Sequence, residues 1–574
     1  MKKTLTILLC LCLVLSMLCA CGGQPASSAP AESAGAPAES TVSAPAPEAP
    51  EAPEEAPQED ASVPAEASVA EAPEEPKYEV TYPVTDQPIT LTLLHSEPML
   101  GPLSGRAGVD SYGDVAGVQA VNEATGVNIE WNEMAMFTAN EEFNLVVASS
   151  DYPDMLSGVA TYYAGGMTKA FEDEVIQDLG DVVNQFAPLY YEAIKADGEL
   201  FRQTLDDEGR TLGVYAIYNE AINNEGAMLR KDWLDELGLE VPTTFEDLTK
   251  VMTAIQQEKG VANPIYINES ANFLSYGYNV KGFDMVSSTI PVYQDNGTVY
   301  CSLNSDNYKA YIGQLREWYE TGLMNPNYME FSSDLMSGEV EVEMNADRIA
   351  IWSGMVTNMT NYYANATDPA FEVVPTVVTL DGGKDHITLA TRSQDAISIS
   401  TACEEVEAAL GWLNYWFTEE GTMLYNYGVE GDTYVMENGT PAYTDKVMNN
   451  ELGVDPTLFC RTFSLAGCSF GYTVQERIYL LYEDYQTAAQ EYWTENTDGS
   501  MAVPTLSLTT EESEVLATYG TDLTTYAAET LPRFIMGELN MEADWDAYVS
   551  TLEDMSIGEI TAVYQAAYDR YLKR

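Results

Sequence analysis

Apolar and polar residues follow two different periods along most of this chain. Residues 88–94 (PITLTLL) form a short apolar run that predicts a buried strand, and residues 118–125 have helical spacing and lead through Gly126 into a second strand at 127–131. The stretch FNLVVASSDYPDML, residues 143–156, predicts a helix, a turn and a strand. Helices that alternate with short strands are typical of layered α/β structure. From Tyr472 onward the pattern is almost wholly helical.

Capping and turn residues mark the ends of several of these elements. Within VPTTFEDL, residues 241–248, two overlapping pairs of threonine and acid fit a capping box at the start of a helix. Gly238 and Gly322 stand just past periodic helices, where a left-handed backbone conformation costs glycine little. Two Asn-Gly pairs, at 296–297 and 438–439, predict hairpin turns.

A mostly apolar run also stands at the N-terminus. Lys2 and Lys3 precede an uncharged stretch, residues 5–20, in the layout of an export signal. The run ends in LCACG, which resembles the lipobox of bacterial lipoproteins and makes Cys21 the acylated residue, although the position of Cys19 is more usually a small or aliphatic residue. We therefore expect residues 1–20 to be a lipoprotein signal peptide, with an uncleaved membrane anchor as the alternative.

Residues 21–77 have the composition of a disordered tether. Residues 22–77 hold eleven of the chain's 27 prolines and twelve acidic residues, with one lysine and no aromatic residue. Such a segment buries too little apolar surface to offset the entropy lost on ordering. At about 3.1 Å per residue, an extended chain of this length reaches roughly 170 Å. We expect the lipid on Cys21 and this tether to hold a globular body at the extracytoplasmic face of the cell membrane, on a Gram-positive cell surface.

The body, residues 78–574, is too long for one ordinary core and predicts two or three. Without the twelve tether acids and the three lysines that precede Tyr78, it keeps 22 basic and 79 acidic residues, a net charge of about −57. So negative a surface repels phosphates and anionic lipids. We expect no nucleic acid partner, no membrane contact apart from the lipid anchor, and a monomer.

Four cysteines lie in the body, too few for a disulfide scaffold: Cys301, Cys403, Cys460 and Cys468. Outside the cell Cys460 and Cys468 could close one small loop, and the sequence leaves open whether they do.

Few residues are available for catalysis. The two histidines of the whole chain, His95 and His386, cannot supply a multi-histidine zinc site and leave almost no material for a histidine-dependent triad. Two carboxylates would suffice for glycoside hydrolysis, but among 79 acids no pair stands out. No Gly-rich phosphate loop or nucleophile elbow is present, and NTDGS around Asp498 is a turn rather than a calcium loop. We expect no enzyme activity, cofactor or metal.

Several stretches resemble one protein family. MLRKDWLDELGL, residues 228–239, running into VPTTFEDL, is similar to the signature of family 1 extracellular solute-binding proteins of bacterial ABC importers. Three further stretches follow in the family's order: EEFNLVVASSDYPDML, NGTVYCSLNSDNYKAYIGQLREWYETGLMNP and DAISISTACEEVEAALGWLNYWFTEEGTMLYNYGVEGDTY. The chain is most similar to the large, carbohydrate-associated lipoprotein branch.

The resemblance implies a two-lobed type II periplasmic-binding-protein fold. Lobe 1 would hold residues 78–216 and 395–427, and lobe 2 residues 217–394 and 428–574. The chain would cross near 215–219, near 390–396 and around 425–430. Ligand would bind between the lobes, favour their closure and be delivered to separate ABC permease subunits.

An oligosaccharide is the expected ligand. The body holds 37 tyrosines and eight tryptophans, and a pyranose ring stacks its apolar face on an aromatic plane while its hydroxyls bind carboxylates and amides. We expect Trp233, Trp318, Trp412 and Trp416 to pack in cores, because each sits within a periodic helix. The candidate ligand-binding residues lie at strand ends or in loops: Glu97, Asp151, Tyr152, Tyr162, Tyr218, Asn219, Glu220, Arg230, Trp352, Ser353 and Asn358.

Two of these candidates have an explicit structural alternative. Trp352 is either a cleft residue at the end of a short strand or that strand's last core residue, and Arg230 either pairs with a bound carboxylate or with an acidic neighbour. Rival functions are an oligopeptide or other solute binder on the same fold, a secreted glycoside hydrolase, and a structural or adhesive surface protein.

Overall fold

Two separate β-sheets organise the body of the protein in the computed structural model, which describes residues 77–95, 108–135, 138–285, 289–332 and 338–574. The expected signal peptide, Cys21, nearly all of the tether and Glu97 lie outside these residues. Each sheet has its own apolar core, which confirms the expected two-lobed α/β architecture. No helix of the described residues is long and apolar enough to cross a membrane.

Lobe 1 is built on a six-stranded sheet with the strand order β13-β4-β10-β3-β1-β2. Its strands are β1 (Ile89–His95), β2 (Val127–Glu133), β3 (Met155–Ser157), β4 (Val214–Tyr218), β10 (Ser393–Ile399) and β13 (Tyr472–Thr473). β1 runs parallel to β2 and β3, with Ile89 opposite Val127 and Leu93 opposite Met155. β10 alone is antiparallel to both of its neighbours. The strands expected near 88–94 and 127–131 are confirmed.

Helices cover this sheet because their apolar faces complete its core. They are α2 (Ala116–Thr125), α3 (Ala139–Ser149), α4 (Val159–Tyr162), α5 (Gly166–Glu172), α6 (Gly180–Phe186), α7 (Pro188–Lys195), α8 (Gly198–Gln203), α14 (Val406–Tyr415) and α15 (Glu419–Tyr427), with the 3-10 turn η2 (Tyr112–Asp114). Trp412 and Trp416, one turn apart on and just after α14, are fully buried, as their helical spacing predicts.

Lobe 2 is built on a three-stranded antiparallel sheet with the order β8-β5-β9. Its strands are β5 (Glu225–Arg230), β8 (Ile351–Met355) and β9 (Val373–Thr376), and a separate hairpin is formed by β6 (Val292–Asp295) and β7 (Thr298–Cys301). The helices of its first part are α9 (Lys231–Leu237), α10 (Phe245–Lys259), α11 (Asp306–Glu320), α12 (Glu339–Asn345) and α13 (Met359–Asn365), with 3-10 turns η3 (Ser275–Tyr278), η4 (Ser302–Asn304), η5 (Tyr328–Glu330) and η6 (Val356–Asn358).

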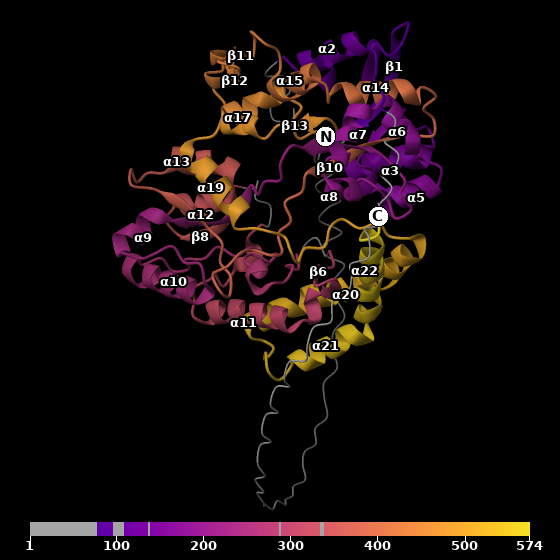
Figure 1. The fold of residues 1–574 in the computed structure, drawn as a ribbon. Helices are drawn as coiled ribbons and strands as arrows, with labels where there is room; N and C mark the ends of the chain where they lie inside the picture. The colour runs from indigo at the N-terminus through magenta and orange to yellow at the C-terminus, as the bar shows by residue number, and fades with distance from the viewer. Residues whose placement is uncertain (1–76, 96–107, 136–137, 286–288, 333–337) are drawn as a thin grey trace, which may run out of the picture. The chain divides into compact units, whose positions relative to one another are not determined.

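The C-terminal part adds helices α19 (Asp484–Glu495), α20 (Thr510–Met536), α21 (Trp545–Asp554) and α22 (Ile557–Tyr571) to lobe 2. Leu531 and Phe534 of α20 pack with Trp318 of α11 and Trp545 of α21 in one continuous core. Figure 1 shows α20 and α22 beside the β6 hairpin and α11. Trp318 and Trp233 are buried core residues, as expected.

The predicted caps are present. Thr244 is the N-cap of α10, and its hydroxyl accepts the backbone N–H of Asp247, so the second of the two overlapping pairs forms the cap. Gly238 ends α9 at φ 64°, in the left-handed region that disfavours other residues. Asn296-Gly297 and Asn438-Gly439 form the turns of β6-β7 and of a second hairpin, β11 (Tyr434–Glu437) and β12 (Thr440–Tyr443).

The chain passes from one sheet to the other at 219–224, between β4 and β5, and at 377–392, between β9 and β10. The third crossing differs from the expected one at 425–430. After α15 the chain forms the β11-β12 hairpin, α16 (Asp445–Met448), α17 (Pro456–Phe459) and the 3-10 turn η7 (Cys460–Thr462), and then pairs β13 with β4. Because Leu465 and Phe470 are buried in the core of lobe 1, residues 428–473 belong to lobe 1. The crossing follows at α18 (Glu476–Tyr479).

The described cysteines are all buried, and Cys460 and Cys468 are not joined as a disulfide. The possible loop closure between them is therefore absent from this structure.

Candidate functional site

One edge of the lobe 1 sheet gathers the ends of several strands. β1, β3, β4 and β13 run in the same direction and finish at this edge, and antiparallel β10 begins there. Both of the first two crossings leave from the same edge, because one follows β4 and the other precedes β10. In open α/β sheets ligands bind outside the carboxyl ends of the strands, so we take this edge as the lobe 1 side of the site.

Four of the sequence candidates lie at this edge. Tyr162 ends α4, the short helix that follows β3, and Tyr218 is the last residue of β4. Asn219 and Glu220 come next on the crossing. The side chain of Asn219 connects two crossings, because its amide donates to Glu476 (2.7 Å) and its oxygen accepts the backbone N–H of Gln475 (2.9 Å). Through these contacts, Asn219 connects the first and third crossings at the hinge.

Asp151 and Tyr152 lie elsewhere. They precede β3, so they stand at its amino end, whereas the site edge is formed by its carboxyl end. Tyr152 packs against the small core formed by α3, α4 and α5. Both residues precede a strand, as the sequence predicts, but a position next to a strand does not by itself indicate which edge of the sheet carries the site.

Arg230 forms a buried ion-pair cluster. Its guanidinium donates to both carboxylate oxygens of Asp232 (2.9 and 2.7 Å) and to Asp347 (2.7 Å), and it lies 4.0 Å from the ring centre of Trp233. Only 1% of its side chain is exposed. The alternative in which Arg230 pairs with acidic neighbours is therefore the one that the structure supports.

Trp352 lies in the interior of lobe 2. It is 0% exposed and packs with Met228 and with Tyr362, whose ring centre is 5.7 Å away. The structure supports the core alternative because the indole is covered on all sides and does not reach a cavity wall. Ser353 and Asn358 are partly exposed near the end of β8, where Met355 stands opposite Glu225, the first residue after the crossing.

Four cavities line the crossings. The largest, about 640 Å³, lies between α4, α5 and β10 of lobe 1 and residues 504–516 of lobe 2. A second of about 410 Å³ shares Gln203, Leu389 and Thr391 with it, and a third of about 180 Å³, which Tyr162 lines, shares Thr161 and Asp395. The fourth, about 340 Å³, opens on lobe 2.

Uncharged polar side chains outnumber charged ones in the lining of the largest cavity. Hydroxyl and amide side chains reach it from both lobes: Thr161, Thr168, Gln203, Thr204, Thr391, Ser393, Gln394, Thr505, Ser507 and Ser513. Tyr163 and Tyr215 add aromatic surface. In the lobe 2 cavity, Ser353 is joined by asparagine and aromatic side chains: Asn223, Asn224, Asn272, Phe273, Tyr276 and Trp493. Such a surface can hydrogen-bond a polyol and stack on its apolar faces.

Two carboxyl groups in these cavities have raised pKa values. Asp395 stands where the 640 and 180 Å³ cavities meet; burial raises its pKa, although the N–H groups of Ala396 and Gly158 and the hydroxyl of Ser469 favour the charged form. Glu225 lines the lobe 2 cavity. Burial by the surrounding protein raises its pKa, and the positive charge of Lys281 cancels only part of that rise. Asp395 is not among the candidates expected from the sequence, although its place next to the second crossing was a usable signal.

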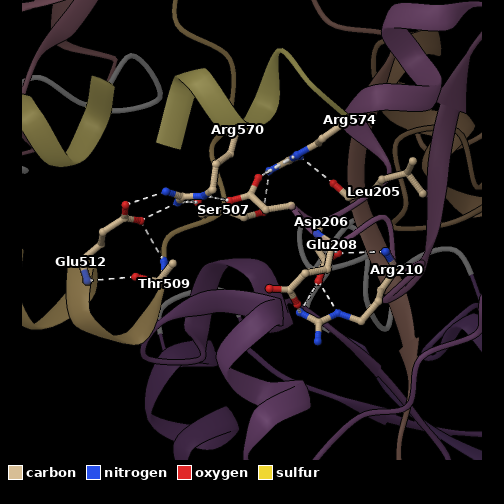
Figure 2. Close-up of polar contacts among 10 residues, drawn as sticks. Leu205, Asp206, Glu208, Arg210, Ser507, Thr509, Glu512, Arg570 and Arg574 are labelled. Carbon is tan, nitrogen blue, oxygen red and sulfur yellow. Dashed lines mark hydrogen bonds and ion pairs between the residues drawn. The ribbon is translucent and has the colours of Figure 1, made fainter. Parts of the chain in front are cut away.

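An arginine cluster joins the two lobes at the rim of the largest cavity. Arg570 and Arg574, at the C-terminal end of α22, both donate to Asp207 in the loop between α8 and β4. Figure 2 shows these two arginines side by side, with Arg574 also donating to the carbonyl of Leu205 and Arg570 pairing with Glu512 of α20. Thr510 of α20 donates to Glu172 of α5 close by (2.8 Å). We call the Asp207, Arg570 and Arg574 group the C-terminal clasp.

A serine, a histidine and an aspartate also meet near the second crossing. Asp498 and Ser500 both contact Nδ1 of His386, at 2.9 and 3.1 Å. In a catalytic triad the serine and the acid bind opposite nitrogens of the ring. This arrangement is therefore not a proton relay. Within the described ranges, no group of three or more His, Cys, Asp and Glu side chains is placed to hold a metal ion.

Comparison with known proteins agrees with this architecture. The sequence profile of the family described as bacterial extracellular solute-binding protein matches residues 116–433. The fructooligosaccharide ABC transporter substrate-binding protein FusA of Streptococcus pneumoniae is 21% identical over 486 residues, which are 79% of this chain and 86% of FusA. Lipoprotein LipO of Bacillus subtilis is 20% identical over 443 residues, 75% of this chain and 84% of LipO.

Among solved structures, the alginate-binding protein AlgQ2, crystallised without calcium, superposes with a TM-score of 0.64 at 19% identity, covering 84% of this chain and 99% of AlgQ2. The two lobes, the crossings between them and the cavities along those crossings define a solute-binding protein. The chain belongs to the bacterial extracellular solute-binding protein family, a family of binding proteins.

Proposed function

We propose that this protein is the substrate-binding component of an ABC importer and that it captures an oligosaccharide at the crossings between its lobes. The observation that carries the proposal is the 640 Å³ cavity, whose hydroxyl and amide side chains come from both lobes. Its volume is in the range of small-molecule sites. The family supports a binding role, and the saccharides for which FusA and AlgQ2 are named support an oligosaccharide ligand.

Ligand held between two lobes acts on their relative position. A sugar that contacts Thr161 and Gln394 in lobe 1 and Thr505 in lobe 2 binds the closed arrangement better than an open one, and so favours closure. Closure withdraws the sugar from water and presents one shape to the permease, a separate membrane protein. No covalent step is needed, and the ligand leaves unchanged.

A thermal-shift screen of the purified protein tests this function. Oligosaccharides of several linkages and a matched set of oligopeptides are added one by one, and a ligand at 100 times its dissociation constant raises the free energy of unfolding by about 2.7 kcal/mol. We expect stabilisation by at least one oligosaccharide and by no peptide. Stabilisation by peptides alone would contradict the sugar assignment, and chromatographic detection of shortened sugar after long incubation would contradict the binding role.

We further propose that the lipid on Cys21 and the acidic tether hold the protein at the extracytoplasmic face of the cell membrane. The lipobox-like LCACG sequence and the lipoprotein relative LipO support this location. In Cys21→Ala the acylated thiol is missing, so we expect the protein to shift from the membrane fraction to the medium with its thermal stability unchanged. Equal membrane retention of the variant and the parent would refute the anchor.

A further inference from the structure

The four cavities at the crossings carry more acids than bases. Their carboxylates are Asp197, Glu199, Asp206, Glu225, Asp385 and Asp395, and their basic groups are Arg202, Lys281, Arg392 and Arg574. An anionic ligand needs cations that are not already neutralised by the protein. The partners of these four basic groups therefore decide which ligand charge the cavities accept.

Each of the three arginines is already paired with a carboxylate. Arg202 lies 2.9 Å from Glu199, Arg392 lies 3.1 Å from Asp197, and Arg574 lies 2.7 Å from Asp207. Lys281 and Glu225 both line the lobe 2 cavity, and the charge of Lys281 offsets part of the rise that burial causes in the pKa of that carboxyl. A bound uronate or sulfate would have to compete with these carboxylates for each of the three arginines.

Two acids line the 640 Å³ cavity, and they differ in their described partners: Asp206 pairs with Arg210, whereas the partners of Asp395 are all uncharged. Its Oδ2 accepts the backbone N–H of Gly158 at 2.9 Å, and its other contacts are the N–H of Ala396 and the hydroxyl of Ser469. The carboxylate lines both the 640 and the 180 Å³ cavities, beside Thr161 and Gln394. It can accept hydrogen bonds from sugar hydroxyls, and it repels a carboxylate placed in the same space.

We infer that these cavities select an uncharged oligosaccharide over uronic or sulfated sugars, and that Asp395 is the residue that sets this selection. The inference rests on the proposed saccharide-binding function and narrows it. Likeness to other proteins does not decide between uncharged and acidic sugars, since FusA is named for a fructooligosaccharide, which is uncharged, and AlgQ2 for alginate, which is acidic. The decisive features are the three paired arginines and the Asp395 carboxylate, which has uncharged partners among the residues that the structure describes.

Matched sugar pairs test the selection. The purified protein is titrated calorimetrically with galactotriose and trigalacturonate, with cellotriose and its uronate counterpart, and with kestose as an additional uncharged sugar. We expect the uncharged sugar of at least one pair to bind, and the dissociation constant of its acidic counterpart to be at least roughly tenfold larger. The ratio of the two dissociation constants should fall between 50 and 500 mM salt, because salt screens the repulsion of the acidic sugar. Equal or tighter binding of the acidic member would overturn the selection and leave the proposed function standing.

Variants identify the residue responsible. Asp395→Asn keeps the shape and one acceptor oxygen, so we expect the preference for the uncharged member to fall at least roughly tenfold, mainly through tighter binding of the acidic sugar. Asp432→Asn, in the exposed turn that precedes β11, is the matched control and should keep the parent's preference. An unchanged preference in a folded Asp395→Asn protein would refute the role of Asp395.

Glu225→Gln is a second test in case Asp395→Asn does not fold. It removes an acid from the lobe 2 cavity and leaves the hydrogen bond between Gly158 and Asp395 in place. We expect Glu225→Gln to reduce the preference for the uncharged sugar over its acidic counterpart. An increased preference would contradict selection by the charge of the cavities. A protein that no sugar of any pair binds would contradict the proposed function, and with it this inference. The two failures are therefore distinguishable.

Discussion

At the scale of single residues, burial separates the candidates that bind from those that hold the fold. Trp352 and Arg230 both carry side chains that could serve a sugar site, but each is enclosed by lobe 2, with 0% and 1% exposure. Sequence spacing placed Trp352 at the end of a strand, whereas it is the second residue of β8. It also could not show that Met228 of β5 and Tyr362 of α13 close over the indole. That information lies in tertiary packing alone.

Trp352→Ala should therefore reduce stability rather than affinity. Removing a buried indole loses its transfer free energy and leaves a cavity, so we expect the free energy of unfolding to fall by about 3–5 kcal/mol. Chemical denaturation measures this loss. The control Tyr300→Ala removes an exposed aromatic side chain of β7 and should stay within about 0.5 kcal/mol of the parent. A Trp352→Ala protein with parental stability but no sugar binding would restore the cleft role.

Arg230 should prove irreplaceable even by lysine. Its planar guanidinium binds Asp232 with two hydrogen bonds and Asp347 with a third, a geometry that an ammonium group does not reproduce. Breaking a buried pair leaves a buried charge, so we expect Arg230→Lys and Arg230→Ala to lower the free energy of unfolding, the latter by roughly 3–5 kcal/mol. Dissociation constants measured by calorimetry should match the parent's in both variants, and selective loss of sugar binding would point to a ligand contact.

At the scale of elements, local sequence features predicted where helices and turns lie. They predicted less well which candidate residues lie at the site edge of the lobe 1 sheet. Thr244, Gly238 and the two Asn-Gly turns lie where capping and turn preferences place them, because those preferences depend on neighbours within a few residues. Tyr162 and Tyr152 were equally good candidates by sequence. The order of the sequence shows that one follows β3 and the other precedes it, but only the strand directions show that the carboxyl end of β3 lies at the site edge.

The start of α20 shows what one cap is worth. Thr509 accepts the N–H of Glu512 and donates its own N–H to the Glu512 carboxylate, which also pairs with Arg570. Thr509→Ala should lower the free energy of unfolding by about 1 kcal/mol. Thr518→Ala, the same change at an exposed position inside the helix, is the control and should cost less than about 0.5 kcal/mol. Equal losses in the two variants would show that the cap contributes nothing.

At the scale of the whole molecule, the length of the chain and its family resemblance predicted two lobes, and the first two crossings lie close to the expected segments. The third crossing could not be read from the sequence, because β13 is two residues long and its pairing with β4 joins segments about 250 residues apart. Contacts between segments still farther apart in the sequence also form the C-terminal clasp, in which the C-terminal end of α22 contacts a loop of lobe 1.

The clasp should restrain the opening of the lobes. Asp207 is 13% exposed and binds Arg570 at 2.6 Å and Arg574 at 2.7 Å, and Arg574 itself is 2% exposed. In Asp207→Asn both arginines lose their carboxylate on lobe 1, so we expect the free energy of unfolding to fall by roughly 1.5–3 kcal/mol. Hinge opening should become easier, because α22 is then joined to lobe 1 by fewer contacts.

Small-angle scattering measures the opening directly. For the parent we expect a smaller radius of gyration with saturating sugar than without it, and for Asp207→Asn a larger ligand-free radius with an unchanged ligand-bound one, because the sugar restores contact between the lobes. Asp432→Asn breaks an exposed pair with Lys446 inside lobe 1 and should behave as the parent does. If Asp207→Asn and the parent gave the same ligand-free radius, the clasp would be a local contact of the C-terminus that leaves the hinge equilibrium unchanged.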